Sequence, residues 1–258
     1  MTTPRKTARY GWRPDIPDAR DRELKAVSLA AHALTPPSVD LRHLCAPIFD
    51  QGDLGSCVAN AAAACHEFAQ AKEREAHIFR PSRLFIYYEC RVVSGTTDYD
   101  SGAQIRDAMK VLNQLGTCPE YEWPYDIGKF TRKPPQSRYV EALSHQTLLY
   151  ARVGQAAADL EACLAAGYPV AFGFTVYESF ESDSVAQSGV VPLPNLESEH
   201  VVGGHAVVMV GYDRAAQRFI CRNSWGTGWG MAGYFTMPYA YVLYPSLASD
   251  FWTIRSVE

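Results

Sequence analysis

One stretch of the chain, residues 50–64, passes from a glycine-containing loop through Cys57 into an almost unbroken run of alanine. Alanine has the highest helix propensity, and apolar residues recur at three- and four-residue steps after the cysteine. The pattern predicts a helix that begins at or next to Cys57. The first N–H groups of a helix lack partners, and the helix dipole is positive there. Both effects favour the thiolate, so Cys57 is predicted to be a nucleophile.

Bulk composition limits the classes of protein that this chain can belong to. The 258 residues are 47% hydrophobic and carry a net charge of −4, which suits one large domain or two lobes with an ample core. This negative net charge gives no indication of a basic surface that would bind nucleic acid or an anionic membrane. No apolar run reaches the ~20 residues of a membrane helix. We expect a monomer that uses no cofactor and no metal.

The N-terminus lacks the apolar segment of a secretory signal, so the sequence is compatible with a cytoplasmic location or with export by another route. Seven cysteines contain no C-x-x-C pair, which argues against a zinc ribbon or a thioredoxin-like motif. We expect reduced thiols. Three of them are expected to be buried as small hydrophobic residues: Cys65, Cys90 and Cys163.

Residues 1–36 differ from the rest of the chain. They carry a net charge of +3 and residues 37–258 a net charge of −7, which together give the −4 of the whole. The segment 10–18 holds two prolines and two aromatic residues, Tyr10 and Trp12, and this favours extended chain over helix. Two interpretations stay open: a disordered tail, or an arm that lies on the oppositely charged body.

Residues 37–258 form the expected folded domain, with helices in its first half and strands in its second. A helix is predicted to open at Ser82. Another is predicted after a capping box at 101–104, with Gly116 as its C-cap. A short helix is expected over 155–166. Strands are expected over 38–42, 168–176, 205–212, 217–222 and 233–237. The fold class is therefore α+β, with a helical lobe at roughly 45–135 and a β lobe at roughly 136–245.

A cysteine nucleophile needs a base, and the base needs a group that holds its ring. His205 follows two glycines and opens an apolar strand, where a polar ring needs a partner. The side-chain oxygen of Asn223 can accept a hydrogen bond from one ring nitrogen and leave the other facing the sulfur. Trp225 can then cover this bond from water. The alternative is a core histidine with a purely structural role.

These residues stand in motifs that resemble the papain family of cysteine peptidases: Gln51 with Gly55-Ser56-Cys57, then Gly204-His205-Ala206, then Asn223-Ser224-Trp225-Gly226. The separation of Cys57 and His205 falls within the ~130–150 residues typical of that family. The resemblance covers roughly residues 37–258. It implies a two-lobed fold, with a helical N-terminal lobe, an antiparallel β-barrel-like C-terminal lobe and an active cleft between them.

The resemblance also implies roles for single residues. Cys57 is expected to form a thioacyl-enzyme with His205 as general base and acid, Asn223 to orient His205, and Gln51 to donate to the oxyanion. The residues expected to contact peptide or protein substrates are Gly102, Ala206, Gly173 and Trp225. In longer members a propeptide crosses the cleft in reverse. We therefore expect residues 1–36 to act as an intramolecular inhibitor, with Tyr10 or Trp12 in a hydrophobic subsite.

The chain departs from the family pattern at two positions. Leu54 stands where the family usually has a cysteine, so one disulfide is missing, and Val58 replaces the aromatic residue that usually follows the nucleophile. Bacterial members with a short N-terminal segment share the first departure. Two rival functions remain: a cysteine acyltransferase of the transglutaminase or amidase kind, and a pseudopeptidase that only binds.

Overall fold

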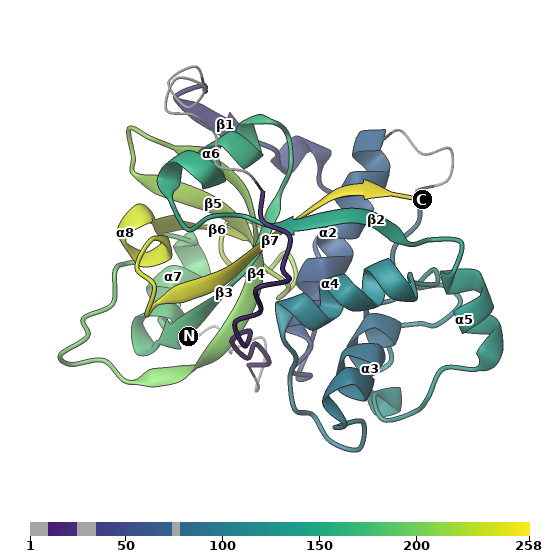
Figure 1. Cartoon of the computed structure of the whole chain (residues 1–258). Coiled ribbons are helices and arrows are strands. Elements are labelled where there is room, and N and C mark those ends of the chain that lie inside the picture. Colours follow the sequence, from purple (N-terminus) through teal and green to yellow (C-terminus); the bar gives the residue numbers. More distant parts are fainter. Residues whose placement is uncertain (1–9, 25–34, 74–77) are drawn as a thin grey trace.

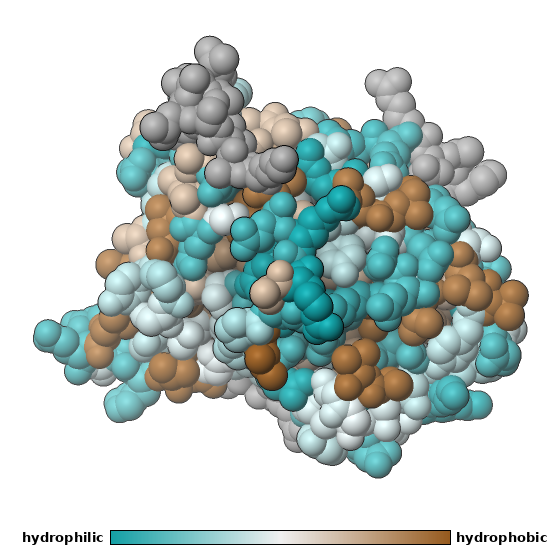
Figure 2. All heavy atoms as spheres, viewed as in Figure 1, coloured by the Kyte–Doolittle hydropathy of each residue, from teal (hydrophilic) through white to brown (hydrophobic). Residues whose placement is uncertain are grey.

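A computed structural model describes residues 10–24, 35–73 and 78–258. Figure 1 shows a helical half beside a β-sheet, with arm residues 10–24 running along the boundary between the two. A hydrophilic band crosses the middle of the same face in Figure 2. The expected α+β arrangement of two lobes is confirmed.

The helical half is built from α2 (Cys57–Glu73), α3 (Arg83–Ser94), α4 (Ile105–Gln114) and α5 (Gln136–Ala142), with 3-10 turns η1 (Arg42–Leu44) and η2 (Ile127–Lys129). The sheet half carries three further helices and one 3-10 turn: α6 (Ala157–Ala165), α7 (Asp183–Ser188), α8 (Tyr239–Val242) and η3 (Glu178–Glu181).

Seven strands form one antiparallel sheet: β1 (Ser38–Asp40), β2 (Thr147–Arg152), β3 (Val170–Tyr177), β4 (Val201–Asp213), β5 (Arg218–Arg222), β6 (Tyr234–Pro238) and β7 (Ala248–Val257). The order is β2-β7-β3-β4-β5-β6, and β1 pairs with β4. Within the described residues this path is open, so the barrel-like lobe that we expected is an open sheet. Its strand β7 lies beyond residue 245, the expected limit of the β lobe.

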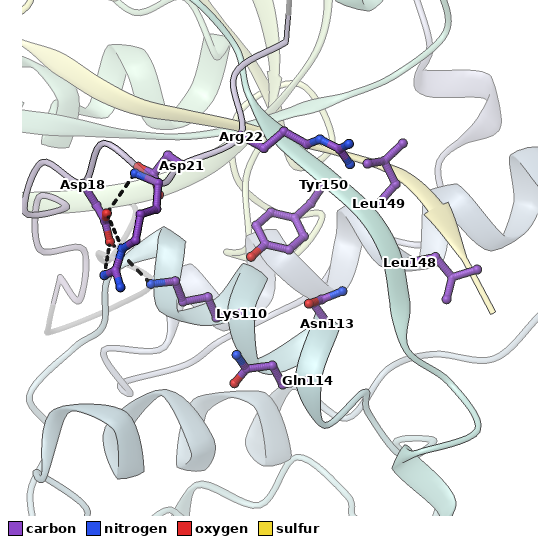
Figure 3. A pocket seen from close by; sticks show the side chains of 10 residues that line it. Asp18, Asp21, Arg22, Lys110, Asn113, Gln114, Leu148, Leu149 and Tyr150 are labelled. Atoms are coloured by element: carbon purple, nitrogen blue, oxygen red, sulfur yellow. Dashed lines mark hydrogen bonds and ion pairs between the residues drawn. The ribbon is translucent and has the colours of Figure 1, made fainter.

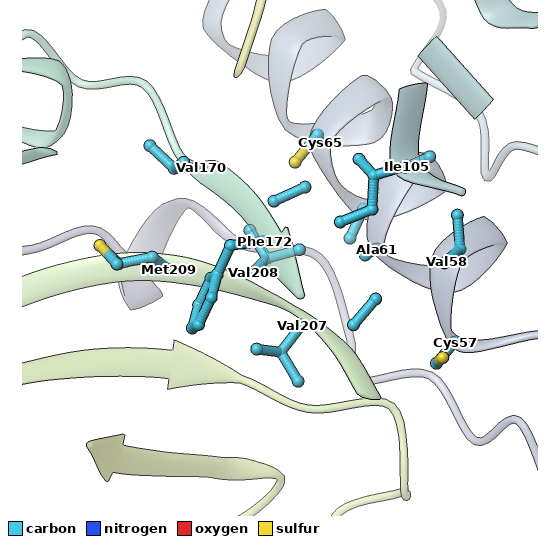
Figure 4. Packing of buried hydrophobic residues seen from close by; sticks show 14 of the residues in the cluster. Cys57, Val58, Ala61, Cys65, Ile105, Val170, Phe172, Val207, Val208 and Met209 are labelled. Atoms are coloured by element: carbon cyan, nitrogen blue, oxygen red, sulfur yellow. The ribbon is translucent and has the colours of Figure 1, made fainter. Parts of the chain in front are cut away.

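Helix α2 is the element around which both halves are assembled. Each of its residues from Cys57 to Gln70 is buried. A helix that is apolar on all sides is typical of a position inside a core, and alanine side chains let neighbouring elements approach closely. Figure 4 shows Ala61 and Cys65 of this helix on the side of β3 and β4.

The start of α3 agrees with the sequence, but that of α4 does not. Ser82 caps α3 by accepting the N–H of Phe85 at 3.2 Å. The capping box predicted at 101–104 is wrong, because α4 begins one residue after Gln104, whose side chain makes no cap bond. The arm supplies the bond instead: the Asp15 carboxylate accepts the N–H of Arg106 at 3.1 Å.

Strand β4 begins at Val201, four positions before the predicted start. His205 therefore lies within the strand, where it pairs in register with Phe174 of β3. This pairing fixes the backbone of His205 against β3. The arm also joins the sheet, since Leu24 donates its N–H to the Arg152 carbonyl at 2.8 Å and the Arg152 N–H reaches the Arg22 carbonyl at 2.8 Å.

All seven cysteines are free thiols, and the predicted burial of Cys65, Cys90 and Cys163 is confirmed. Leu54, which replaces a family cysteine, is itself buried in the core. None of the described helices is long and apolar enough to cross a membrane.

We predict that Ser82→Ala lowers the free energy of unfolding by about 1–2 kcal/mol, because the substitution removes the α3 cap. It also leaves the Trp123 carbonyl, which accepts the Ser82 hydroxyl at 2.7 Å, without its donor. Urea denaturation measures the change. Ser182→Ala, at the cap of the short helix α7, is the control and loses one bond only. Equal effects of the two substitutions would contradict this account.

Candidate active site

The loop before α2 is joined to the sheet half by backbone hydrogen bonds. Gln51 donates its N–H to the Ser224 carbonyl at 2.9 Å, and Gly226 donates to the Phe49 carbonyl at 2.9 Å. These bonds run between positions far apart in the sequence. They place Gln51 beside the segment that carries Asn223 and Trp225.

Arg83, at the start of α3, holds this loop in place through hydrogen bonds. Its Nη1 donates to the Asp50 carbonyl and to Asn60 Oδ1, both at 3.0 Å. Its other nitrogens form an ion pair with Glu120 at 2.7 Å. Sequence reasoning missed Arg83, since nothing in a helix-start arginine indicates that it will reach a loop more than thirty positions earlier.

Cys57 is the first residue of α2 and is completely buried. Burial raises the pKa of its thiol to about 11. Hydrogen bonds to the sulfur from the backbone N–H groups of Ala206, Gly11 and Val58 act in the opposite direction. These N–H groups belong to the residue that follows His205, to the arm and to α2 itself.

The imidazole of His205 is held by Asn223, whose Oδ1 lies 2.8 Å from His205 Nε2. The Asn223 oxygen also accepts the N–H of Ser224 at 2.9 Å. Trp225 stacks on the His205 ring with centroids 4.9 Å apart, and it is almost completely buried. The other ring nitrogen, Nδ1, is buried without a hydrogen-bond partner in the described part of the chain. Because the Asn223 oxygen can only accept, this arrangement favours the tautomer that carries its proton on Nε2 and leaves Nδ1 without one.

While the arm covers the site, burial favours the neutral forms of both the Cys57 thiol and the His205 imidazole. Burial lowers the pKa of His205 to about 4, against which the Asn223 hydrogen bond works, and burial raises that of Cys57. Much of this covering is the arm, because the Tyr10 ring contacts both His205 and Trp225, at centroid distances of 5.7 and 6.0 Å. At neutral pH the covered pair is thiol and imidazole.

The side chain of Gln51 is buried and fixed at both ends. Its Nε2 donates to the Leu54 carbonyl at 2.8 Å, and its Oε1 accepts the Ser224 hydroxyl at 2.6 Å. Because the Leu54 carbonyl can only accept, it determines which end of the amide is the NH₂, and the Ser224 hydroxyl then donates to the oxygen. One N–H of this NH₂ remains for a further acceptor near the start of α2.

The arm occupies the space beside these residues by backbone pairing. The Gly11 carbonyl accepts the N–H of Ala103 at 2.8 Å, and Arg13 donates to the Ala103 carbonyl at 3.0 Å. On the opposite side Trp12 donates its N–H to the Gly204 carbonyl at 3.1 Å. The pairing of Trp12 with Ala103 is parallel. The arm is thus an extended segment inserted between the two halves.

The indole of Trp12 is the part of the arm that fills a subsite. Trp12 is only 8% exposed, and its indole lies against Gly173. A Cβ atom added to Gly173 would lie 1.9 Å from the indole ring. Its Nε1 donates to Asp250 Oδ2 at 3.1 Å. Of the two aromatic residues considered, Trp12 lies in the pocket with Gly173, whereas Tyr10 lies on His205.

Gly102 and Ala206 also border the arm. Gly102 contacts the Gly11 carbonyl so closely that a Cβ atom would lie 2.2 Å from that oxygen. The site residues proposed from the sequence therefore lie along the arm, between the helical half and the sheet half. The structure adds Arg83, Asp250 and Asp15, whose roles depend on contacts with distant parts of the chain.

Two other features lie outside the region of Cys57 and His205. No cluster of three or more His, Cys, Asp or Glu residues that could hold a metal occurs among the described residues. A surface hollow of about 560 Å³ lies where the arm meets α4 and β2. Figure 3 shows its lining, which includes Asp18, Lys110 and Tyr150 but neither Cys57 nor His205.

Comparison with known families assigns the class of protein. Residues 35–243 match the model of the papain family of cysteine proteases. The chain belongs to this family, and it is a papain-like cysteine peptidase.

Among individual proteins, the chain is similar over its whole length to xylellain, a cysteine protease from Xylella fastidiosa, with 42% identity, a TM-score of 0.89 and full coverage of both chains. It is 40% identical over 281 residues to an uncharacterized peptidase C1-like protein of Acanthamoeba polyphaga mimivirus, covering 100% of this chain and 90% of that protein. A cathepsin B-like protein of Giardia intestinalis is 30% identical over 231 residues, covering 84% of this chain and 73% of the relative.

We predict that Gln51→Ala lowers kcat by about 10²–10³ with little change in KM, the size of loss seen when an oxyanion donor is removed. Ser224→Ala should cause a smaller loss of kcat, because the amide stays but its orientation is no longer fixed. Steady-state cleavage of a fluorogenic peptide measures both. Ser224→Thr keeps the hydroxyl and is the matched control. An unchanged kcat in Gln51→Ala would rule out this role.

Proposed function

We propose that the chain hydrolyses peptide bonds through a thioacyl-enzyme on Cys57, and that arm residues 10–24 inhibit it reversibly. The first part rests on the backbone pairing of the loop before Cys57 with the segment of Asn223, which holds His205. The second part rests on the pairing of Gly11 with Ala103 and of Trp12 with Gly204, which places the arm between the two halves.

The chemical steps follow from the neighbours of the sulfur. Cys57 transfers its proton to His205 Nδ1, and the thiolate adds to the carbonyl carbon of the substrate. The oxyanion accepts hydrogen bonds from the Cys57 N–H and from Gln51 Nε2. His205 then gives its proton to the leaving amine as the C–N bond breaks. A water molecule, deprotonated by His205, attacks the thioester and releases the acid and the thiol.

Asn223 holds the imidazole in position throughout this cycle. Its oxygen accepts the Nε2–H in both the neutral and the protonated state of His205, so one hydrogen bond serves every step. The stacked Trp225 keeps water from that bond. These two contacts support the assignment of His205 as base and then acid, over a structural histidine.

The arm can occupy the cleft without being cleaved, because it does not present a carbonyl carbon to the sulfur. The Gly11 carbonyl oxygen accepts the N–H of Ala103, and the backbone N–H of Gly11 is one of the groups that lower the pKa of Cys57. No electrophilic carbon is therefore placed in the oxyanion site. The arm pairs with Ala103 in parallel, so a chain running in the opposite direction, antiparallel to Ala103, is the one that can present its carbonyl.

We predict that full-length chain with Trp12→Ala cleaves peptide at least tenfold faster than wild type, since truncating a buried Trp removes about 3–5 kcal/mol of packing. Gly11→Ala should have the same effect by another route, because its Cβ would lie 1.7 Å from the Gly55 carbonyl oxygen. Ile16→Ala is the control, because that side chain is 72% exposed.

Alkylation of Cys57 by iodoacetamide at pH 7 provides a second measurement that needs no substrate. Release of the arm removes the burial that holds the thiol pKa at about 11, so the alkylation rate of Cys57 should rise together with peptidase activity in Trp12→Ala. Peptide mapping by mass spectrometry separates Cys57 from the six other thiols. Equal rates in wild type, in Trp12→Ala and after removal of residues 1–36 would refute inhibition by the arm.

A further inference from the structure

Two arginines of the folded body lie beyond the Trp12 pocket, at the far end of the arm. We propose that Arg106 and Arg152 form a subsite for an acidic side chain of the peptide substrate, which the arm fills with its own Asp21. The inference rests on the proposed function, because it names a substrate class for the same cleft.

The carboxylate of Asp21 lies between the two guanidinium groups. Arg106 Nε donates to Asp21 Oδ1 at 2.8 Å and its Nη2 reaches the other oxygen, which is a bidentate pair. Arg152 Nη1 donates to the same Oδ2 at 3.0 Å. The Arg106 and Asp21 side chains are 5% and 7% exposed. Although burial opposes it, this double pairing keeps the pKa of Asp21 below its ordinary value.

The arm contributes the acidic partners of Arg106, and on the body its guanidinium lies over the Trp252 ring, 6.0 Å from the ring centroid. The acids that interact with it most strongly are Asp21, Asp15 and Asp18, and its Nη1 donates to the Ile16 carbonyl. Arg152 has one partner on the body, Asp250 at 3.2 Å. When the arm leaves, two guanidinium groups lose their shared carboxylate. A carboxylate on the substrate restores the pairs, because an unpaired charge at a partly buried site is unfavourable.

The subsite has a defined place along the cleft. If the position of Gly11 beside Cys57 is counted as P1, Trp12 corresponds to P2, and Asp15 and Ile16 correspond to P5 and P6. Burial and the nearby Asp250 raise the pKa of Asp15 to about 6, so a negative charge is unfavourable at the position of its carboxylate. The position of Asp21 suits it well. Arg106 also donates to the Asp15 carboxylate and to the Ile16 carbonyl, so P4 to P6 are the positions at which we expect a glutamate to place its carboxylate there.

Lys110 provides a matched control for a general charge effect. It lies one turn after Arg106 on α4 and faces Asp18 at 3.9 Å, as Figure 3 shows. Its side chain is 37% exposed and does not contact Asp21 in the described structure. Removal of its charge therefore changes the electrostatics nearby without removing a donor of the subsite.

The test uses full-length protein and pairs of fluorogenic peptides that differ only by Glu or Gln at P4, P5 or P6. For each pair the ratio of kcat/KM is measured. The arm competes equally with both peptides, so its occupancy cancels in the ratio. We expect about tenfold preference for Glu at one or more of the three positions, and loss of that preference at high salt.

Variants then assign the preference to the two arginines. Arg106→Gln should abolish the Glu preference and, at the same time, raise the activity on the Gln peptide, because it also loosens the arm. Arg152→Gln should reduce the preference, and Lys110→Gln should keep it. Thermal melting of each variant shows that it is folded. A ratio near one at all three positions in wild type, or a preference that survives in both arginine variants, overturns the proposal.

Failure of this inference can be told apart from failure of the proposed function. If the subsite does not exist, both peptides are still cleaved and Cys57 is still labelled by an epoxysuccinyl inhibitor, only without a Glu preference. If the chain is not a peptidase, neither peptide is cleaved by wild type or by Trp12→Ala.

Discussion

The structure depends on one short piece of backbone pairing between segments at opposite ends of the folded domain. The carbonyl and N–H groups of Phe49 and Gln51 bond to Gly226 and Ser224, and the Ser224 hydroxyl continues the contact to the Gln51 amide. Through this pairing the loop that leads into α2 and the segment that carries Asn223 become one unit. The sulfur, the imidazole and the amide keep their relative positions only while these bonds hold.

The arm is a structural part of this protein as well as an occupant of its cleft. Its Asp15 provides the cap that α4 lacks in its own sequence, its Asp21 neutralises Arg106, and its Trp12 fills an apolar pocket. Each contact satisfies a group that the body leaves open. The free energy of docking is therefore distributed over several sites, and release requires that substrate or solvent satisfies the same groups.

The sequence predicted what local pattern and spacing can determine. The alanine run indicated α2, and the order of Cys57, His205 and Asn223 indicated both the family and the fold. The missed features depend on contacts between distant residues. Strands β2 and β7 lack clear turn signals and alternation. The true start of α4 was hidden because its cap comes from Asp15, and Arg83 is informative only once α3 lies beneath the loop at Asp50.

The burial of Cys57 beneath the arm affects how easily its sulfur is oxidised. Oxidation to a sulfenic acid needs an accessible thiolate, and the docked arm leaves this sulfur protonated and out of reach of solvent. The fold itself contains no disulfide that a reducing agent could open. In the arm-bound state that we propose, the sulfur is therefore shielded from peroxide, and it becomes open to oxidation only while the arm is released.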